Sequence, residues 1–101
     1  MANIKFSYLY RDGANYKNFG EVVFGVPDNL NVVELEALIR LRLIDATWFY
    51  ADKWLIPDLH FGSWDSEIDH GFHEFECISY TEECANSPVS LAEFMAAMAR
   101  N

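Results

Sequence analysis

Two runs of alternating apolar and polar residues flank a turn near the N-terminus. The first run covers residues 4–11, and its alternate positions are apolar: Ile4, Phe6, Tyr8 and Tyr10. The second covers residues 17–26, with Val22, Phe24 and Val26 on one side and Glu21 on the other. Asp12-Gly13 begins the turn between them. Because side chains alternate between the two faces of a strand, this pattern predicts an antiparallel β-hairpin with one buried face.

A helix is predicted after the break at Pro27-Asp28. Asn31 followed by Glu34 is a relative of the capping box, with Asn in place of Ser or Thr. The helix is expected to end near Ile44, and its apolar side chains recur at helical spacing: Val32, Leu35, Leu38, Ile39 and Leu43. Arg42 falls on the same face, so we expect its aliphatic stem to extend from the apolar face to solvent near the helix C-terminus.

The second half of the chain has three parts. Residues 46–64 are predicted to be an irregular, aromatic-rich segment that covers one edge or face of the sheet. Residues 72–81 are predicted to form a third strand, with less cleanly separated faces. Ser90 and Glu93 form a full capping box for a terminal helix, whose predicted buried stripe is Leu91, Phe94, Met95 and Met98.

The expected order of elements is therefore β-β-α-(irregular)-β-α. It predicts one α+β domain over residues 1–101, with a small antiparallel sheet of three to four strands and two helices packed on one face. The N-terminus lacks the basic and apolar regions of a signal peptide, and no apolar run reaches membrane-span length. We therefore expect a cytoplasmic protein that does not enter membranes, with Cys77 and Cys84 as free thiols.

The net charge of −9 comes from the second half of the chain. Residues 1–44 contain five acids and five bases, whereas residues 45–101 contain eleven acids and two bases. Residues 58–83 contain eight acids and no Lys or Arg. A field of this sign repels nucleic acid phosphates and attracts basic surfaces, so we expect a basic protein or nucleoprotein partner and no direct binding of nucleic acid.

A metal site or a small enzyme site is the main alternative use of this region. It would be built on His60, His70 and His73 with the surrounding carboxylates. Residues 65–76 also resemble a calcium loop, but Gly71 stands one place after the position where the loop requires glycine. On a regular strand His73 and Cys77 would share a face, about 13 Å apart, which is too far for one tetrahedral ion.

No cysteine has the sequence context of a catalytic nucleophile, and neighbouring acids reduce thiol reactivity. We therefore predict no catalytic residue, no metal ligand and no cofactor. The aromatic residues near the acids suggest anchors for a partner rich in Arg and Lys, and Trp54, Phe61 and Trp64 are expected to be partly exposed.

Small size, one-sided acidity and the lack of a catalytic signature make the chain similar to the small inhibitors of phages and mobile elements, including anti-CRISPR and anti-restriction proteins. The resemblance implies an inhibitor that occupies a basic, nucleic-acid-binding surface, in some cases as a nucleic-acid mimic. An immunity protein or antitoxin against a basic nuclease fits the same charge pattern, and acidity that serves only solubility is a further alternative. The predicted partner-binding residues are Asp58, Trp64, Asp65, Glu67, Asp69, Glu74, Glu76, Glu82 and Glu83.

Overall fold

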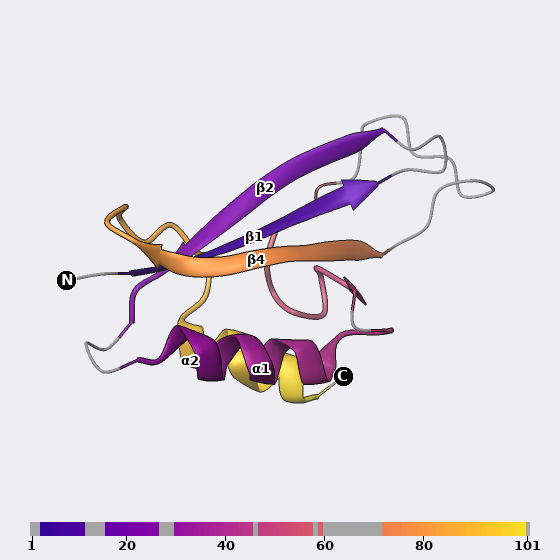
Figure 1. The fold of residues 1–101 in the computed structure, drawn as a ribbon. Coiled ribbons are helices and arrows are strands. Elements are labelled where there is room, and N and C mark those ends of the chain that lie inside the picture. Colours follow the sequence, from indigo (N-terminus) through magenta and orange to yellow (C-terminus); the bar gives the residue numbers. More distant parts are fainter. Residues whose placement is uncertain are drawn as a thin grey trace.

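The computed structural model describes residues 3–11, 16–26, 30–45, 47–57, 59 and 72–100. The elements follow one another as β1 (Asn3–Arg11), β2 (Lys17–Phe24), α1 (Val32–Arg42), β3 (Trp48–Phe49), β4 (His73–Thr81) and α2 (Leu91–Ala99). The four strands form one antiparallel sheet in the order β2-β1-β4-β3. Both helices lie on the same side of this sheet (Figure 1). The predicted α+β class, N-terminal hairpin and helix placement are confirmed, and the irregular segment supplies the short fourth strand.

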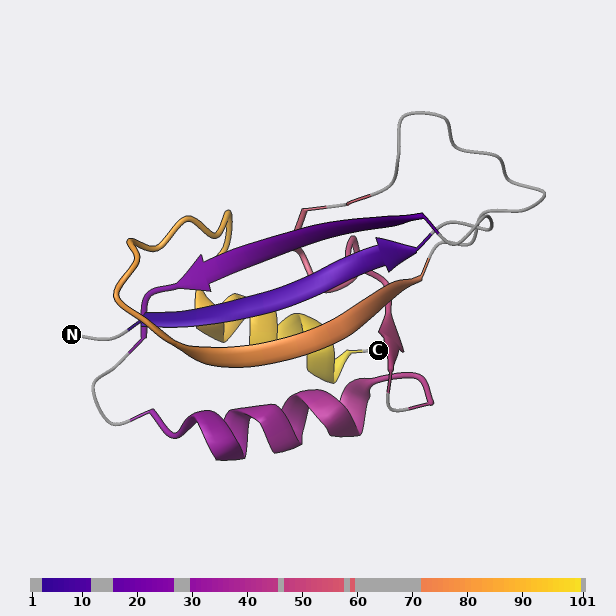
Figure 2. The ribbon, with the colours of Figure 1, turned by 45° about the horizontal axis from the view of Figure 1, so that its top comes forward.

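The core lies between the sheet and the helices. Strand β1 is an inner strand of the sheet, between β2 and β4 (Figure 2). The alternate residues of β1 that the sequence assigned to one face are all buried: Ile4, Phe6, Tyr8 and Tyr10. The Phe6 ring centroid lies 5.3 Å from those of Phe75 and Phe94. It also lies 5.7 Å from the Phe49 ring and 6.4 Å from the Trp54 ring. Strand β4, helix α2, strand β3 and the turn that follows it therefore meet on one side chain of the central strand.

Strand β4 contains a β-bulge that changes which face its side chains occupy. Phe75 pairs with Tyr8, but Cys77 pairs with Ser7, so Glu76 is an extra residue without a partner on β1. His73 consequently faces the core, whereas Cys77 faces the opposite side. The expectation that these two residues share a face is wrong, because the extra residue reverses the alternation between them.

The segment that leads to α2 makes hydrogen bonds to backbone groups on the outer edge of β2. The Val23 N–H donates to Asn86 Oδ1 at 2.8 Å, and the Val23 carbonyl accepts from the N–H groups of Asn86 and Ser87. Gly20 causes no bulge, since β2 pairs with β1 in one continuous register. Its role is close packing: a Cβ atom there would lie 2.7 Å from Leu59 Cδ2.

Both helices begin with the predicted caps. Asn31 Oδ1 accepts from the N–H groups of Val33 and Glu34, and Ser90 and Glu93 make both bonds of the capping box. Helix α1 ends at Arg42, two residues before the expected end, and Leu38 is 45% exposed, so its place in the buried stripe is a misassignment. Among the described residues, no helix is long and apolar enough to cross a membrane.

Residues 51–56 form a single turn that ends as a helix does in a Schellman motif. The Ile56 N–H donates to the Ala51 carbonyl at 3.1 Å, and the Leu55 N–H donates to the Asp52 carbonyl at 3.3 Å. Leu55 has φ = 65°, the left-handed conformation that usually selects glycine. The turn also buries Trp54, which is 1% exposed, so the expectation that Trp54 is a surface anchor is wrong.

Replacing Leu55 by glycine is expected to stabilise the fold. Leu55 is 39% exposed, and a left-handed non-glycine residue costs about 1 to 2 kcal/mol, part of which is offset by the backbone entropy of glycine. We expect L55G to raise the free energy of unfolding by about 0.5 to 1 kcal/mol in urea titrations. L55A removes most of the same side chain but keeps the positive φ, so it should show no gain. Equal stability of L55G and L55A would contradict this explanation.

Candidate functional site

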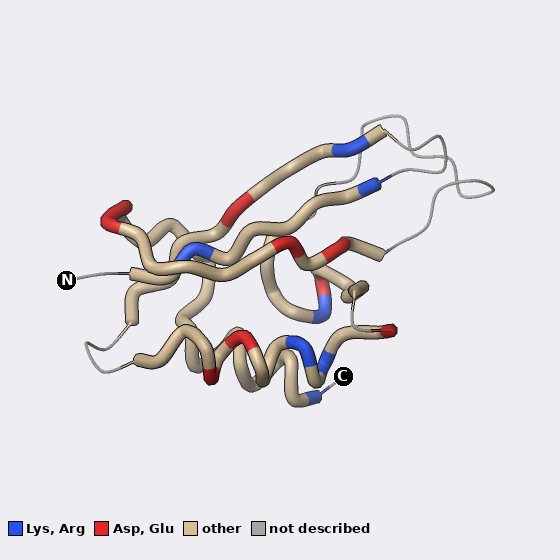
Figure 3. The backbone as a smooth tube through the Cα atoms, viewed as in Figure 1, with Lys and Arg blue, Asp and Glu red and all other residues tan. Residues whose placement is uncertain are grey.

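The sheet face opposite the helices carries polar side chains from three strands, and we call it the open sheet face. Its positions follow from the strand register: Lys5, Ser7, Leu9 and Arg11 of β1, Lys17, Phe19, Glu21 and Val23 of β2, and Glu74, Cys77, Ser79 and Thr81 of β4. Acidic and basic positions both occur along these strands (Figure 3). The bulge residue Glu76 is also exposed.

Ion pairs neutralise part of this surface. Arg11 Nε donates to Glu74 Oε2 at 2.8 Å, and this contact raises the pKa of Arg11. Lys5 Nζ contacts Glu83 and lies 3.6 Å from Glu21 Oε1. The hydrogen bond with Glu83 raises the pKa of Lys5, and the same bond lowers the pKa of Glu83. The charge of Glu74 and much of that of Glu83 are therefore compensated within the chain.

Glu76 stands in a different environment. It borders a shallow hollow of about 290 Å³ together with Ser7, Phe19, Gly20 and Glu21. Among the described residues, no Lys or Arg lies within ion-pair distance of Glu76. Phe19, which borders the same hollow from β2, is 60% exposed. In such a hollow the carboxylate can accept hydrogen bonds from a guanidinium or ammonium group, and the exposed ring can pack against the same group.

The structure describes some of the predicted partner-binding residues and not others. Glu76 and Glu82 are exposed, whereas Glu74 and Glu83 are engaged by Arg11 and Lys5. The other predicted residues lie outside the described part of the chain: Asp58, Trp64, Asp65, Glu67 and Asp69. Phe61 is outside it as well.

His73 is a core residue, 1% exposed, and its Nε2 accepts the backbone N–H of Leu59 at 2.9 Å. Its ring lies 5.3 Å from the Tyr10 ring and 5.9 Å from that of Phe49. This bond fixes the backbone of Leu59, two residues after Pro57, to the buried side chain of β4. His60 and His70 lie outside the described residues, within which no cluster of His, Cys, Asp or Glu is arranged for a metal. Cys77 and Cys84 are exposed free thiols.

Phe19 and Glu21 are the site residues that sequence reasoning missed. They belong to the half of the chain whose charges cancel, so the charge count did not select them. Antiparallel pairing places Glu21 opposite Ser7, which in turn pairs with Cys77 beside the bulge. The alternation of β2 already put Glu21 on the polar face, and this was the only signal available.

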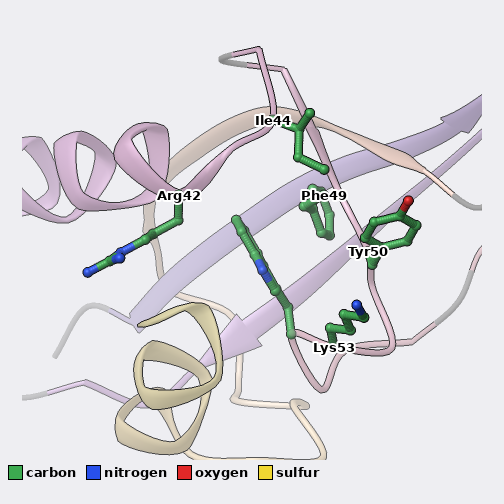
Figure 4. Close-up of a pocket in the computed structure, with 6 residues that line it drawn as sticks. Arg42, Ile44, Phe49, Tyr50 and Lys53 are labelled. Atoms are coloured by element: carbon green, nitrogen blue, oxygen red, sulfur yellow. The ribbon is translucent and has the colours of Figure 1, made fainter. Parts of the chain in front are cut away.

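A second hollow, of about 260 Å³, lies at the C-terminal end of α1. It is lined by Arg42, Ile44, Phe49, Tyr50, Lys53 and Trp54 (Figure 4). Lys53 Nζ lies 5.2 Å from the centre of the Tyr50 ring. Arg42 extends away from Lys53 in the close-up, so the two cationic groups do not converge on one ligand position. The exposed Arg42 agrees with the expected path of its side chain to solvent.

Comparisons of the chain with protein-family models, with curated protein sequences and with solved structures find no significant match.

Removal of the His73 side chain is expected to destabilise the protein strongly. H73A would leave a cavity among aromatic rings and a Leu59 N–H without its acceptor, so we expect a loss of about 3 kcal/mol. C77A on the same strand is exposed and should change stability by less than about 0.5 kcal/mol. Urea unfolding of both variants checks this contrast, and a mild effect of H73A would contradict the core role.

The Lys5–Glu83 contact predicts an acid-sensitive ion pair. Because the pKa of Glu83 is lowered in the folded state, the pair stabilises the fold above the unfolded-state pKa and is lost as the pH falls through the folded value. We expect the Glu83 carboxyl carbon to titrate below the ordinary value of 4.5 in NMR spectra. K5M should move that titration upward. An unchanged Glu83 titration in K5M would show that Lys5 is not the cause.

Proposed function

We propose that this protein is a binding protein that inhibits a partner by occupying its basic, nucleic-acid-binding surface through the open sheet face. The observation that carries the proposal is Glu76, which no Lys or Arg of the described residues pairs with, at the edge of a hollow that the exposed ring of Phe19 also borders. Glu21 borders the same hollow, and the chain as a whole carries a net charge of −9. Carboxylates would take the place of phosphates as acceptors for Arg and Lys of the partner.

Charge alone gives fast association but little discrimination between basic partners. An apolar contact near the carboxylates adds specificity, because the binding energy of an interface concentrates in a few well-packed side chains. Phe19 is the largest exposed apolar residue of β2, and Tyr16 just before that strand is 69% exposed. An anti-CRISPR or anti-restriction inhibitor and a nuclease immunity protein would both use such a surface.

The binding proposal is tested by comparing partners that the wild-type chain and surface variants retain from host lysate. E76K and F19T should each weaken retention about tenfold or more, since each removes one part of the carboxylate and ring contact. D52K makes the same charge change as E76K in the turn after β3, on the other side of the sheet, and should retain the same partners.

A captured protein supports the proposal only if it meets three conditions. It must elute as salt rises from about 50 mM to about 500 mM, which screens charge contacts. It must bind nucleic acid, and the wild-type chain but not E76K must displace that nucleic acid. Equal capture by wild type and E76K, or a partner that binds nucleic acid and this chain together, would overturn the proposal.

A further inference from the structure

Helix α1 has apolar residues on two faces, of which one is buried and one is exposed. Leu35 and Ile39 are buried against the sheet, as an amphipathic helix requires. Yet Val33 is 76% exposed and Leu41 is 78% exposed, on the side away from the core. A helix that is apolar on both sides has a surface available for a second contact in addition to its own core.

Two neighbouring rows of α1 define this outer surface. One row is apolar and consists of Val33, Ala37 and Leu41, at intervals of four residues. The adjacent row is Glu34, Leu38 and Arg42, which has opposite charges at its two ends. Glu34, Leu38 and Arg42 also border the groove between α1 and α2, whose two hollows measure about 260 and 140 Å³.

The charges of α1 are symmetric in sequence about Leu38. Glu34 and Arg42 stand four residues before and after it, and Glu36 and Arg40 stand two residues before and after it. The helix is therefore neutral in a chain with a net charge of −9. Arg40 and Glu36 already pair within the helix at 3.4 Å, whereas Glu34 and Arg42 have no ion pair among the described residues.

We infer that α1 is the contact surface for a second copy of this chain, in an antiparallel arrangement with a two-fold axis at the level of Leu38. That arrangement places Glu34 of each copy level with Arg42 of the other, and it places Leu41 about 3 Å along the helix axis from the level of the other copy's Val33. A parallel arrangement would instead bring Glu34 against Glu34 and Arg42 against Arg42, which repel. Antiparallel helices also align their dipoles favourably.

The rest of the molecule favours this choice of occupant. Two copies of a strongly acidic chain repel each other, and the repulsion is weakest where a neutral element separates their charges. Helix α1 is also firmly placed: Tyr80 Oη donates to the Leu30 carbonyl at 2.5 Å and accepts the Val32 N–H, and Arg40 lies 5.1 Å from the centre of the Phe75 ring. The outer rows are thus presented on a fixed helix, on the other side of the sheet from the open sheet face (Figure 1).

Analytical ultracentrifugation over a concentration series tests the inference. We expect the wild-type chain to reach twice its mass of 11.7 kDa. L41S should raise the dimer dissociation constant about tenfold or more, while helix content by circular dichroism stays unchanged, because Leu41 is largely exposed. A chain that stays monomeric at every concentration, or L41S that dimerises as the wild type does, would overturn the inference.

Charge swaps test the geometry. E34R and R42E should each weaken the dimer by a similar factor, since each brings like charges together across the two-fold axis. The double variant E34R/R42E restores opposite charges only in the antiparallel arrangement and should dimerise like the wild type. No recovery in the double variant would exclude that arrangement.

Two variants separate this inference from the proposed function. F19T removes a similarly exposed apolar side chain from the open sheet face, and it should leave the dimer intact while weakening partner capture. L41S should do the opposite in each assay. Loss of dimerisation in F19T would show that a different surface joins the two copies.

Discussion

The burial of Phe6 at the centre of β1 is the contact on which the other elements depend. Its ring meets aromatic side chains from β3, β4, α2 and the turn after β3. Strand β1 is paired on both sides, with β2 and β4, and this position lets Phe6 touch elements that are far apart in the sequence. Fully burying one such ring contributes on the order of 2 kcal/mol, and close ring contacts add to it. Helix α2 and strand β3 each bring an aromatic ring to this one position.

Concentrating aromatic residues on the core face leaves the opposite face of the sheet free for polar side chains. Ion pairs compensate its charge at Arg11 and Lys5, and the bulge at Glu76 leaves one carboxylate outside these pairs. A bulge next to a binding position is a familiar way to redirect a side chain. The same extra residue keeps His73 in the core and Cys77 at the surface, so a single irregularity separates a structural residue from the exposed site.

The two proposed surfaces lie on opposite sides of the sheet (Figure 1). The open sheet face carries the carboxylate of Glu76 and the exposed ring of Phe19 at one hollow, which suits a basic partner, whereas the outer rows of α1 are neutral and largely apolar, which suits a second copy. A dimer joined through α1 would turn two open sheet faces outward and bind a repetitive or two-fold partner with greater avidity than one copy. Figure 3 shows where the acidic and basic residues lie along the strands and along α1.

The sequence by itself determined the element order, the hairpin, both helix caps and the overall acidity, because periodicity, capping residues and charge are local properties. The sequence did not predict the features that depend on pairing between distant segments. Only the register of β4 on β1 reveals the bulge, only the packing around Phe6 buries Trp54, and only the approach of the segment at Leu59 makes His73 a core residue. The candidate site joins Glu21 and Glu76, which are 55 positions apart in the chain. No local pattern encodes such a neighbourhood, since strand pairing creates it.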